Sequence, residues 1–533
     1  MKKSILVLAL SVSLFITKSQ TFQWSSNYFY LPYTNGNQVC QDNDGNVYVA
    51  GEFTPSSFSG KQPFGAFVNK YSPGGGLIWT KIFQQSMRMK MAVNSKKEVL
   101  CIAFDSSGYY LRTLDQSGNE LSYLSICPKI NGSLINHVHG IGVDAFDNIY
   151  VMGNISENYQ IGKFNLTAGT YDTRMFVAKM DKQHSVIWAI SSNKGSPPEI
   201  PFQTSFYVDP LGNSYIGGDY GMAGMEMGSY SLPVSKSSAG FVSKISPVGL
   251  TEWLIQAGQN SAGFAHVNAI TADIWGNVYL AGFYNKPIII AGKNMTSDPN
   301  FNLNSFILKL NNKGNALWVK QMDGPNDDVI TSLVAKENLY VYGQIQSVSS
   351  IDNVTLTSAM TPAGQANEPF IAKFDEYGNI AWWNKIDCSP MSVAKAGGIY
   401  SNVNSNDVFV TGSLKGAAYF DNHPQVTQDI SMFLGKIADS EQVGLATYEK
   451  ENDAVVFPNP SKGPVRLTVN GSENDECDIK IINSEGVVVK RILQKINSSQ
   501  TTIELDLSYL PKGMYLINIS SNSMSVVLKQ VLN

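Results

Sequence analysis

Charged side chains are scarce in this chain of 533 residues. Asp, Glu, Lys and Arg make up 15% of it, against about 25% in a typical globular protein. The net charge is −4 and the sequence pI is about 5.8, so the chain lacks the basic surface that binding to nucleic acid requires. Aromatic residues account for 11%, and glycine occurs 45 times. This composition is typical of an all-β protein with many turns.

Cysteine and histidine are also rare, with five residues of each. A disulfide framework would need denser, regularly spaced cysteines, so we expect buried thiols with at most one bridge. His137 and His139 in "HVHG" fall on one face of a predicted strand, where they could seat a metal. No third ligand follows at a suitable spacing. We therefore predict no metal site and no cofactor.

Long apolar runs are confined to the start of the chain. "MKKSILVLALSVSLFITKSQ" has two lysines, an apolar run from Ile5 to Ile16 and then small and polar residues. This pattern predicts a secretory signal peptide over residues 1–20. No later run approaches the ~18 apolar residues of a membrane span, so we expect an exported chain without a transmembrane segment.

Two phrases recur along the rest of the chain. The first reads "DNDGNVYVAGEF" (42–53), "DAFDNIYVMGNI" (144–155), "DPLGNSYIGGDY" (209–220) and "DIWGNVYLAGFY" (273–284). The second begins with Phe-(Val/Ile)-x-Lys and ends on Trp twelve positions after the Phe, at 67–79, 176–188, 241–253, 306–318 and 370–382. Trp188, Trp253, Trp318 and Trp382 lie 65, 65 and 64 residues apart. Such self-similarity predicts a repeat architecture.

Each repeat predicts four short strands joined by hairpins. Asp, Gly and Asn mark the tight turns, and four-stranded antiparallel units arranged around an axis form a β-propeller. An extra hairpin is expected between the second and third strands at 159–168, 225–234, 288–297 and 350–359. The second unit (98–124) lacks both this hairpin and the tryptophan. We expect the extra hairpins on the same face as the loops between units.

Counting units predicts a seven-bladed β-propeller over residues 21–438. The seventh unit lacks its own Trp strand, and "TFQWSSNY" (21–28) resembles the missing strand. We therefore expect the N-terminal strand to close the ring, so that six tryptophans share one structural role. The pattern resembles propeller repeats of bacterial secreted proteins over roughly residues 22–438. It indicates the fold and leaves the activity open.

The periodicity stops after Ile437. Residues 439–454 are polar and predict a linker, and 455–533 alternate like a small Ig-like β-sandwich. This segment resembles the C-terminal sorting domain of the type IX secretion system of Bacteroidetes-type bacteria. The residues that match the family motifs are Pro458, Asn459, Pro460, Gly463, Leu507, Leu510, Gly513, Tyr515 and Lys529. We expect Pro-Asn-Pro to form a rigid entry to the first strand.

The sorting-domain resemblance implies three things. The secretion machinery would recognise residues 455–533, the chain would reach the extracellular space or outer cell surface, and the domain would then be removed. The remaining protein would be released or attached to lipopolysaccharide. We expect that removal of 455–533 leaves the propeller folded, because the linker is poor in apolar residues.

Other candidate sites have simpler structural interpretations. "DNDGN" (42–46) has oxygen ligands at alternate positions but lacks the glutamate of an EF-hand, so a hairpin turn is favoured. The repeated lysines indicate a packing role; they are Lys70, Lys179, Lys244, Lys309, Lys373 and Lys436. The acidic segment "DGPNDD" (323–328) lies on a predicted loop between units, and paired carboxylates for glycoside cleavage stay open there.

Three functions fit these observations. The favoured one is a secreted or surface-displayed propeller that binds a glycan or a protein on its loop-rich face, without catalytic residues. The alternative is an extracellular hydrolase or lyase that acts on a polysaccharide or peptide. A further alternative is a passive structural component of the cell envelope.

Overall fold

The computed structural model describes an all-β chain. Among the described residues no helix is long and apolar enough to cross a membrane. The predicted signal peptide (1–20, except Gln20) and nearly all of the predicted linker lie outside the described residues. The described residues are 20–30, 33–55, 64–128, 136–168, 173–193, 204–221, 224–235, 237–258, 263–297, 303–358, 360–361, 364–365, 367–389, 392–401, 407–438, 454–470, 475–483, 488–496, 498–521 and 525–532.

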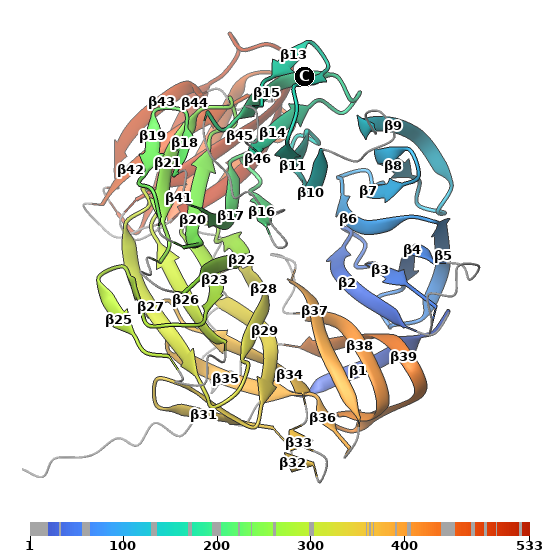
Figure 1. Cartoon of the computed structure of the whole chain (residues 1–533). Helices are drawn as coiled ribbons and strands as arrows, with labels where there is room; N and C mark the ends of the chain where they lie inside the picture. The colour runs from blue at the N-terminus through green and yellow to red at the C-terminus, as the bar shows by residue number, and fades with distance from the viewer. Residues whose placement is uncertain are drawn as a thin grey trace, which may run out of the picture.

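Before residue 439 the described strands form seven sheets of four or more strands and four two-stranded sheets, and the larger sheets surround a central axis (Figure 1). Sheet 1 is β2 (Thr34–Gln41), β3 (Val47–Phe53), β4 (Gly65–Tyr71) and β5 (Leu77–Gln84); sheet 2 is β6 (Met87–Val93), β7 (Val99–Asp105), β8 (Gly108–Leu114) and β9 (Glu120–Pro128). Sheet 3 is β10 (His137–Val143), β11 (Ile149–Ile155), β14 (Arg174–Met180) and β15 (Val186–Ser191); sheet 4 is β16 (Ser205–Val208), β17 (Ser214–Tyr220), β20 (Ala239–Ile245) and β21 (Thr251–Gln256). Sheet 5 is β22 (Ala265–Ala272), β23 (Val278–Tyr284), β26 (Asn304–Leu310) and β27 (Ala316–Asp323), and the hairpin of β30 (Val348–Ile351) and β31 (Val354–Thr357) extends it beyond β27. Sheet 6 is β28 (Val329–Ala335), β29 (Leu339–Gln346), β34 (Asn367–Phe374) and β35 (Ile380–Lys385).

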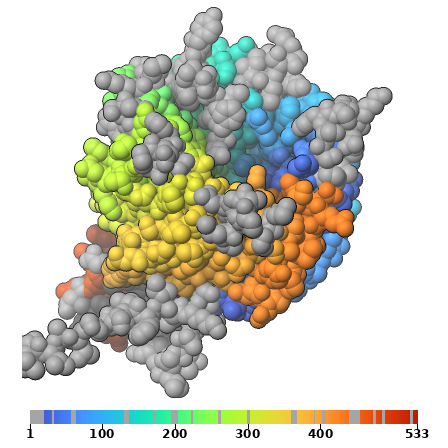
Figure 2. Space-filling model, turned by 60° about the horizontal axis from the view of Figure 1, so that its bottom comes forward, coloured from blue at the N-terminus to red at the C-terminus, as the bar shows by residue number. Residues whose placement is uncertain are grey.

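Sheet 7 joins the two ends of the ring. It consists of β37 (Val393–Ser401), β38 (Asp407–Phe420), β39 (His423–Ala438) and β1 (Phe22–Tyr28), with the short β36 (Asp387–Cys388) also paired to β38. β1 runs antiparallel to β39, with Trp24 opposite Lys436. The prediction that the N-terminal strand completes the last unit is therefore confirmed. Figure 2 shows the consequence: the orange end of the ring lies beside its blue start.

The innermost strands hold the ring together at its centre. Each of β2, β6, β10, β16, β22, β28 and β37 contacts the next, and β37 contacts β2. Amide side chains reinforce these contacts: the Gln38 side chain accepts a hydrogen bond from the Met91 N–H and donates one to the Met91 carbonyl. Such hydrogen bonds satisfy backbone groups on the free edge of an innermost strand, where no further strand is paired.

Four small hairpins stand where the sequence predicts them. They are β12 (Tyr159–Ile161) with β13 (Phe164–Leu166), β18 (Met225–Met227) with β19 (Tyr230–Leu232), β24 (Ile288–Ile290) with β25 (Lys293–Met295), and β30 (Val348–Ile351) with β31 (Val354–Thr357). A shorter pair, β32 (Met360–Thr361) with β33 (Gly364–Gln365), forms a separate two-stranded sheet between β31 and β34 in the chain. β7 and β8 of sheet 2 are joined directly, as expected.

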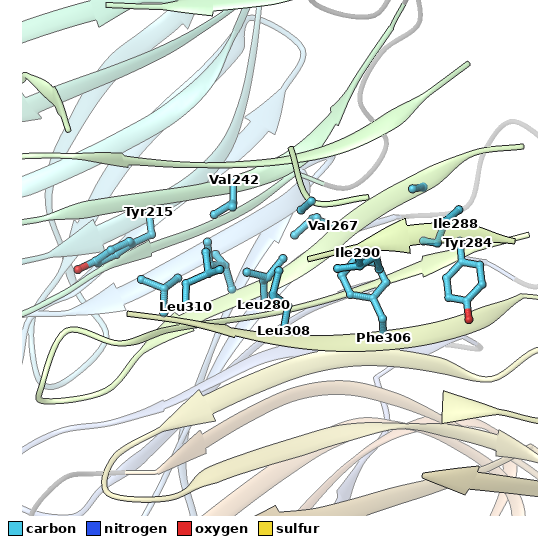
Figure 3. Close-up of a cluster of buried hydrophobic side chains, with 14 of the residues drawn as sticks. Tyr215, Val242, Val267, Leu280, Tyr284, Ile288, Ile290, Phe306, Leu308 and Leu310 are labelled. Atoms are coloured by element: carbon cyan, nitrogen blue, oxygen red, sulfur yellow. The ribbon is translucent and has the colours of Figure 1, made fainter. Parts of the chain in front are cut away.

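These hairpins contribute to the core. In Figure 3, Ile288 and Ile290 lie in line with Phe306, Leu308 and Leu310 of sheet 5. Tyr215 and Val242 of sheet 4 close the same cluster from the other side. Burying each such side chain stabilises the fold by about 1.5–3 kcal/mol. The hairpins therefore pack between sheets and do not simply add free loops to one face.

The C-terminal domain is a sandwich of two sheets. One is β40 (Ala454–Phe457), β41 (Pro464–Asn470) and β44 (Gln500–Asp506); the other is β43 (Val488–Lys495), β42 (Glu476–Ile482), β45 (Gly513–Ser520) and β46 (Ser525–Leu532). Their facing side chains form one core. We expected residues 458–460 to lead into the first strand of this domain, but they join β40 to β41. The expectation failed because the short strand before the prolines pairs with β41 and is itself part of the sheet.

Candidate functional site

One row of three side chains recurs in six of the seven sheets. An aromatic residue on the second strand faces a lysine on the third, and the lysine faces a tryptophan on the fourth. The lysine amine lies 5.1 to 5.9 Å from the aromatic ring centre, close enough for a cation–π interaction. The rows are Tyr48, Lys70 and Trp79; Tyr150, Lys179 and Trp188; Tyr215, Lys244 and Trp253; Tyr279, Lys309 and Trp318; Tyr340, Lys373 and Trp382; and Phe409, Lys436 and Trp24.

In four of these sheets the tryptophan of the row also donates a hydrogen bond to the next sheet. Trp79 Nε1 and Lys70 Nζ both donate to the Gln116 carbonyl of sheet 2, at 2.9 and 3.1 Å. Trp188 and Lys179 do the same to the Pro247 carbonyl of sheet 4, at 3.0 and 3.4 Å. Each hydrogen bond contributes about 1 kcal/mol. These contacts account for the lysines and tryptophans as packing residues.

The indole rests on a glycine of the neighbouring turn. A Cβ added to Gly249 (φ +83°) would come within 3.0 Å of the Trp188 ring, and one added to Gly314 (φ +82°) within 2.5 Å of Ile255 and 3.1 Å of Trp253. The glycine is thus required twice, by its backbone conformation and by the close approach. Tryptophan in one sheet and glycine in the next form a matched pair.

The repeated aspartate of the turn is held by hydrogen bonds. Asp144 Oδ1 accepts from the N–H groups of Phe146 and Asn148, and Asp144 Oδ2 accepts from the side chains of Asn148 and Tyr150. Asp42 makes the corresponding contacts in sheet 1. This is the side-chain turn that the sequence favoured over a calcium loop. No group of three or more metal-ligating side chains occurs among the described residues.

Sheet 2 replaces every member of the row. Leu100 faces Thr113, and Thr113 faces Ser122, in the register that the other sheets use for Tyr, Lys and Trp. Asn94 and Glu98 stand where the turn Asp and Asn stand elsewhere. In sheet 3 the matched glycine is also gone, because His184 (φ +67°) occupies that position. The tryptophan and the glycine that contact each other at other junctions are therefore both absent at the junction of sheets 2 and 3.

A cavity of about 200 Å³ lies where the row is missing. Sheet 2 lines it with the replacing residues, and sheet 3 lines its other side. The lining residues are Asn94, Lys96, Glu98, Leu100, Thr113, Leu121, Ser122, Asp147, Ile149, Lys182 and His184. Its volume corresponds to roughly six or seven water molecules. The cavity opens among the turns that join first to second and third to fourth strands; we call this side of the ring the turn face.

Two hydroxyl groups of the cavity have no partner in the described part of the chain. They are Thr113 Oγ1 and Ser122 Oγ, both buried. The carboxylates at the rim already accept hydrogen bonds: Glu98 from Asn94 at 2.7 Å, and Asp147 from Ser95 at 2.7 and 2.8 Å. An orphaned buried hydroxyl costs about 1–3 kcal/mol. No water-sized molecule touches either oxygen in this conformation, so an occupant of the cavity reaches the two hydroxyls only when these side chains rotate.

The two histidines singled out from the sequence lie on the innermost strand of sheet 3. Their rings are stacked, with centres 6.1 Å apart. His137 Nδ1 lies 3.4 Å from Arg88 Nη1 and from Tyr109 Oη, and His139 Nε2 contacts Asn154 Oδ1. Burial lowers the pKa of His139 to about 4, and burial with the Arg88 charge lowers the pKa of His137. The arginine beside the pair disfavours a cation there.

The acidic segment 323–328 joins β27 to β28, between sheets 5 and 6, as predicted. Burial raises the pKa of Asp328 to about 7, and the charges of Asp323 and Asp327 add to the shift. That value would suit a general acid. However, the Asp328 side chain is fully buried, and Asp327 accepts a hydrogen bond from the Leu303 N–H. The two carboxylates do not face one open site.

The residues of the predicted sorting motif meet in the C-terminal domain. Asn459 Oδ1 accepts from the Val531 N–H at 2.9 Å, and the Asn459 amide donates to the Lys529 carbonyl. The Gly463 carbonyl accepts from the Leu507 N–H at 3.0 Å. Leu507 and Leu510 pack in the core of the domain, and Tyr515 donates to the Pro511 carbonyl at 2.7 Å. The loop of Pro458 and Pro460 is thus tied to the last strand.

Residues 455–533 match the family "Secretion system C-terminal sorting domain". This domain marks the chain for export to the cell surface or the extracellular space, and implies recognition by the type IX secretion machinery. A search of curated proteins finds no match.

Solved structures resemble the chain only distantly. A protein of unknown function from Dyadobacter fermentans is 9% identical, with a TM-score of 0.36, and the match covers 78% of this chain and 98% of that one. Drosophila Plexin A in complex with Semaphorin 1b is 8% identical (TM-score 0.35; 79% and 88% covered). The α-L-arabinofuranosidase Arb93A from Fusarium graminearum is 9% identical (TM-score 0.36; 77% and 99% covered).

Proposed function

We propose that the chain is an exported extracellular binding protein, and that the cavity between sheets 2 and 3 holds its ligand. One observation carries the proposal: the row that fills every other sheet is replaced there by shorter side chains, two of which present buried hydroxyls without partners. The ring around the cavity is held by the six remaining rows. A rigid frame around a preformed cavity is suited to binding at low entropic cost.

The lining favours a neutral sugar residue. Lys96 and Lys182 balance Glu98 and Asp147, so the cavity has no excess of charge for an ion. Leu100 and Ile149 offer apolar surface to the carbon face of a ring. After rotation of their side chains, Thr113 and Ser122 could each donate to and accept from its hydroxyls. The volume is below the ~300 Å³ of drug-sized pockets, so we expect one terminal saccharide unit to enter.

The test is binding of the full chain to a panel of immobilised glycans. We expect binding to one class of neutral terminal sugar, and loss of that binding in the double variant Ser122→Trp with His184→Gly, which restores the matched pair of the other sheets. The matched control is the reverse exchange between sheets 5 and 6, Trp318→Ser with Gly378→His. It should weaken the fold but leave glycan binding intact.

Two results would overturn the proposal. Glycan binding that survives Ser122→Trp with His184→Gly would place the ligand elsewhere, and no binding to any glycan would favour a structural role in the envelope. Cleavage of a bound polysaccharide by the full chain would show that the protein is a hydrolase or a lyase and not only a binding protein.

A further inference from the structure

An apolar cluster joins the ring to the C-terminal domain. Phe146, Ile482 and Leu516 are buried in it, and four partly buried residues complete it: Ala145, Leu211, Met514 and Val527. Phe146 and Leu211 belong to the turn face of sheets 3 and 4. Ala145 lies in the same turn as Phe146. The remaining residues belong to strands of the C-terminal domain: Ile482 to β42, Met514 and Leu516 to β45, and Val527 to β46.

On the ring, the cluster covers positions that are otherwise exposed. Phe146 and Leu211 are the third residues of their Asp-x-x-(Gly/Asp)-Asn turns; the same position is Asp44 in sheet 1 and Trp275 in sheet 5. Trp275 is 36% exposed, whereas Phe146 is 6% exposed. A hydrogen bond of 3.0 Å from the Ala145 N–H to the Pro210 carbonyl links the two covered turns. Together they form one rigid apolar platform.

On the C-terminal domain, the cluster uses the outer face of a sheet. Ile482 and Leu516 are cross-strand neighbours, while Tyr515 and Ile517, next to Leu516 in sequence, point into the domain core. A sheet with one solvated face alternates apolar and polar residues. Here both faces are apolar around Met514–Ile517. This is the pattern of a strand that is buried on both faces, so the outer face is expected to contact another part of the protein.

The contact is small. Seven apolar residues fall well short of the 20–30 residues per side that a stable association of separate proteins needs. The segment between the last strand of the ring and β40 is residues 439–453, and so short a tether supplies an effective concentration in the millimolar range. A contact too weak to hold two free molecules is sufficient under that condition.

We infer that the C-terminal domain covers the turn face of sheets 3 and 4 only while residues 439–453 are intact. Cutting this segment releases the domain and uncovers Phe146 and Leu211 on the remaining ring. This inference does not depend on the saccharide proposal.

The test uses the full chain with a specific protease site placed within 439–453. Before the cut we expect a compact particle by small-angle X-ray scattering; after it, at micromolar concentration, the two fragments should elute separately. The variant Phe146→Asp should separate the domains without cutting, seen as a larger radius of gyration. Trp275→Asp, at the equivalent turn of sheet 5, is the matched control and should change nothing. Leu211→Ser provides a second, milder variant of the platform, and an unchanged circular dichroism spectrum verifies folding.

Fragments that stay together after the cut would overturn the inference, because the interface would then hold without its tether. So would an uncut wild-type chain as extended as Phe146→Asp, because the contact would then not form in solution.

Discussion

Sheets 2 and 3 are neighbours with the same four-stranded topology, yet they solve the problem of packing differently. Sheet 3 fills its outer half with Tyr150, Lys179 and Trp188 and fastens them to the Pro247 carbonyl of sheet 4. Sheet 2 places Leu100, Thr113 and Ser122 in the same register and leaves a cavity. The comparison shows that a four-stranded sheet forms even without the row. The space that the missing side chains would fill is then a cavity.

The largest loss of stability is expected in sheet 7, where the tryptophan of the row comes from the N-terminal strand. A chain beginning at residue 30, compared with one beginning at residue 20, loses β1 and with it Trp24. It leaves β39 as an open edge and removes Trp24 and Tyr28 from the apolar cluster between sheets 7 and 1, although β37, β38 and β39 still contact β2. We expect the unfolding midpoint to fall by about 10 °C or more, since several kcal/mol of burial are lost. Equal midpoints for the two chains, measured by calorimetry, would show that ring closure adds little.

A single row can then be compared directly with its replacement. Trp188→Ala should lower the free energy of unfolding by about 3–5 kcal/mol, the usual cost of removing a buried aromatic side chain. Ser122→Ala, at the same register position of sheet 2, should be neutral or slightly stabilising because it removes an orphaned hydroxyl. Denaturant titration measures both. A loss of similar size in the two variants would mean that sheet 2 is packed as tightly as sheet 3.

Much of this arrangement follows from the sequence. Ring closure, the four hairpins and the shared role of the tryptophans could be predicted because the repeat fixes register: the twelve-residue step from Phe to Trp sets which side chains face each other. The irregular second unit was also visible. What the sequence does not show is that Ser122 and His184, 62 positions apart, face one cavity, because this requires the neighbouring sheet to be placed.

The contact between the domains could not be predicted for a different reason. The linker is poor in apolar residues, from which we expect a propeller that stays folded without 455–533, and this expectation does not address a contact between the surfaces of the two domains. The signal lay in the run from Met514 to Ile517, where apolar residues do not alternate with polar ones. Such a run predicts a strand buried on both faces, but nothing in the sequence identifies Phe146 and Leu211 as its cover.

A smaller effect sharpens the contrast between two buried aspartates. Asp144 accepts four hydrogen bonds in its turn, whereas burial raises the pKa of Asp328 to about 7. Because this value lies above that of the unfolded chain, Asp328 stabilises the fold at low pH, and the contribution is lost as the pH rises from about 4 to 7. Asp328→Asn should remove this loss, of at most about 1.4 kcal/mol per pH unit. Parallel pH profiles of unfolding for the variant and the wild type would contradict it.

The most direct measurement is the unfolding midpoint of the full chain, with and without the saccharide found in the glycan panel, for the wild type and for Ser122→Trp with His184→Gly. If the cavity is the space of a missing row and the site of the ligand, the variant unfolds at a higher temperature than the wild type without ligand, because an indole fills the space. The saccharide should then raise the midpoint of the wild type alone. A variant that unfolds earlier than the wild type, or that gains as much from the saccharide, would contradict the account.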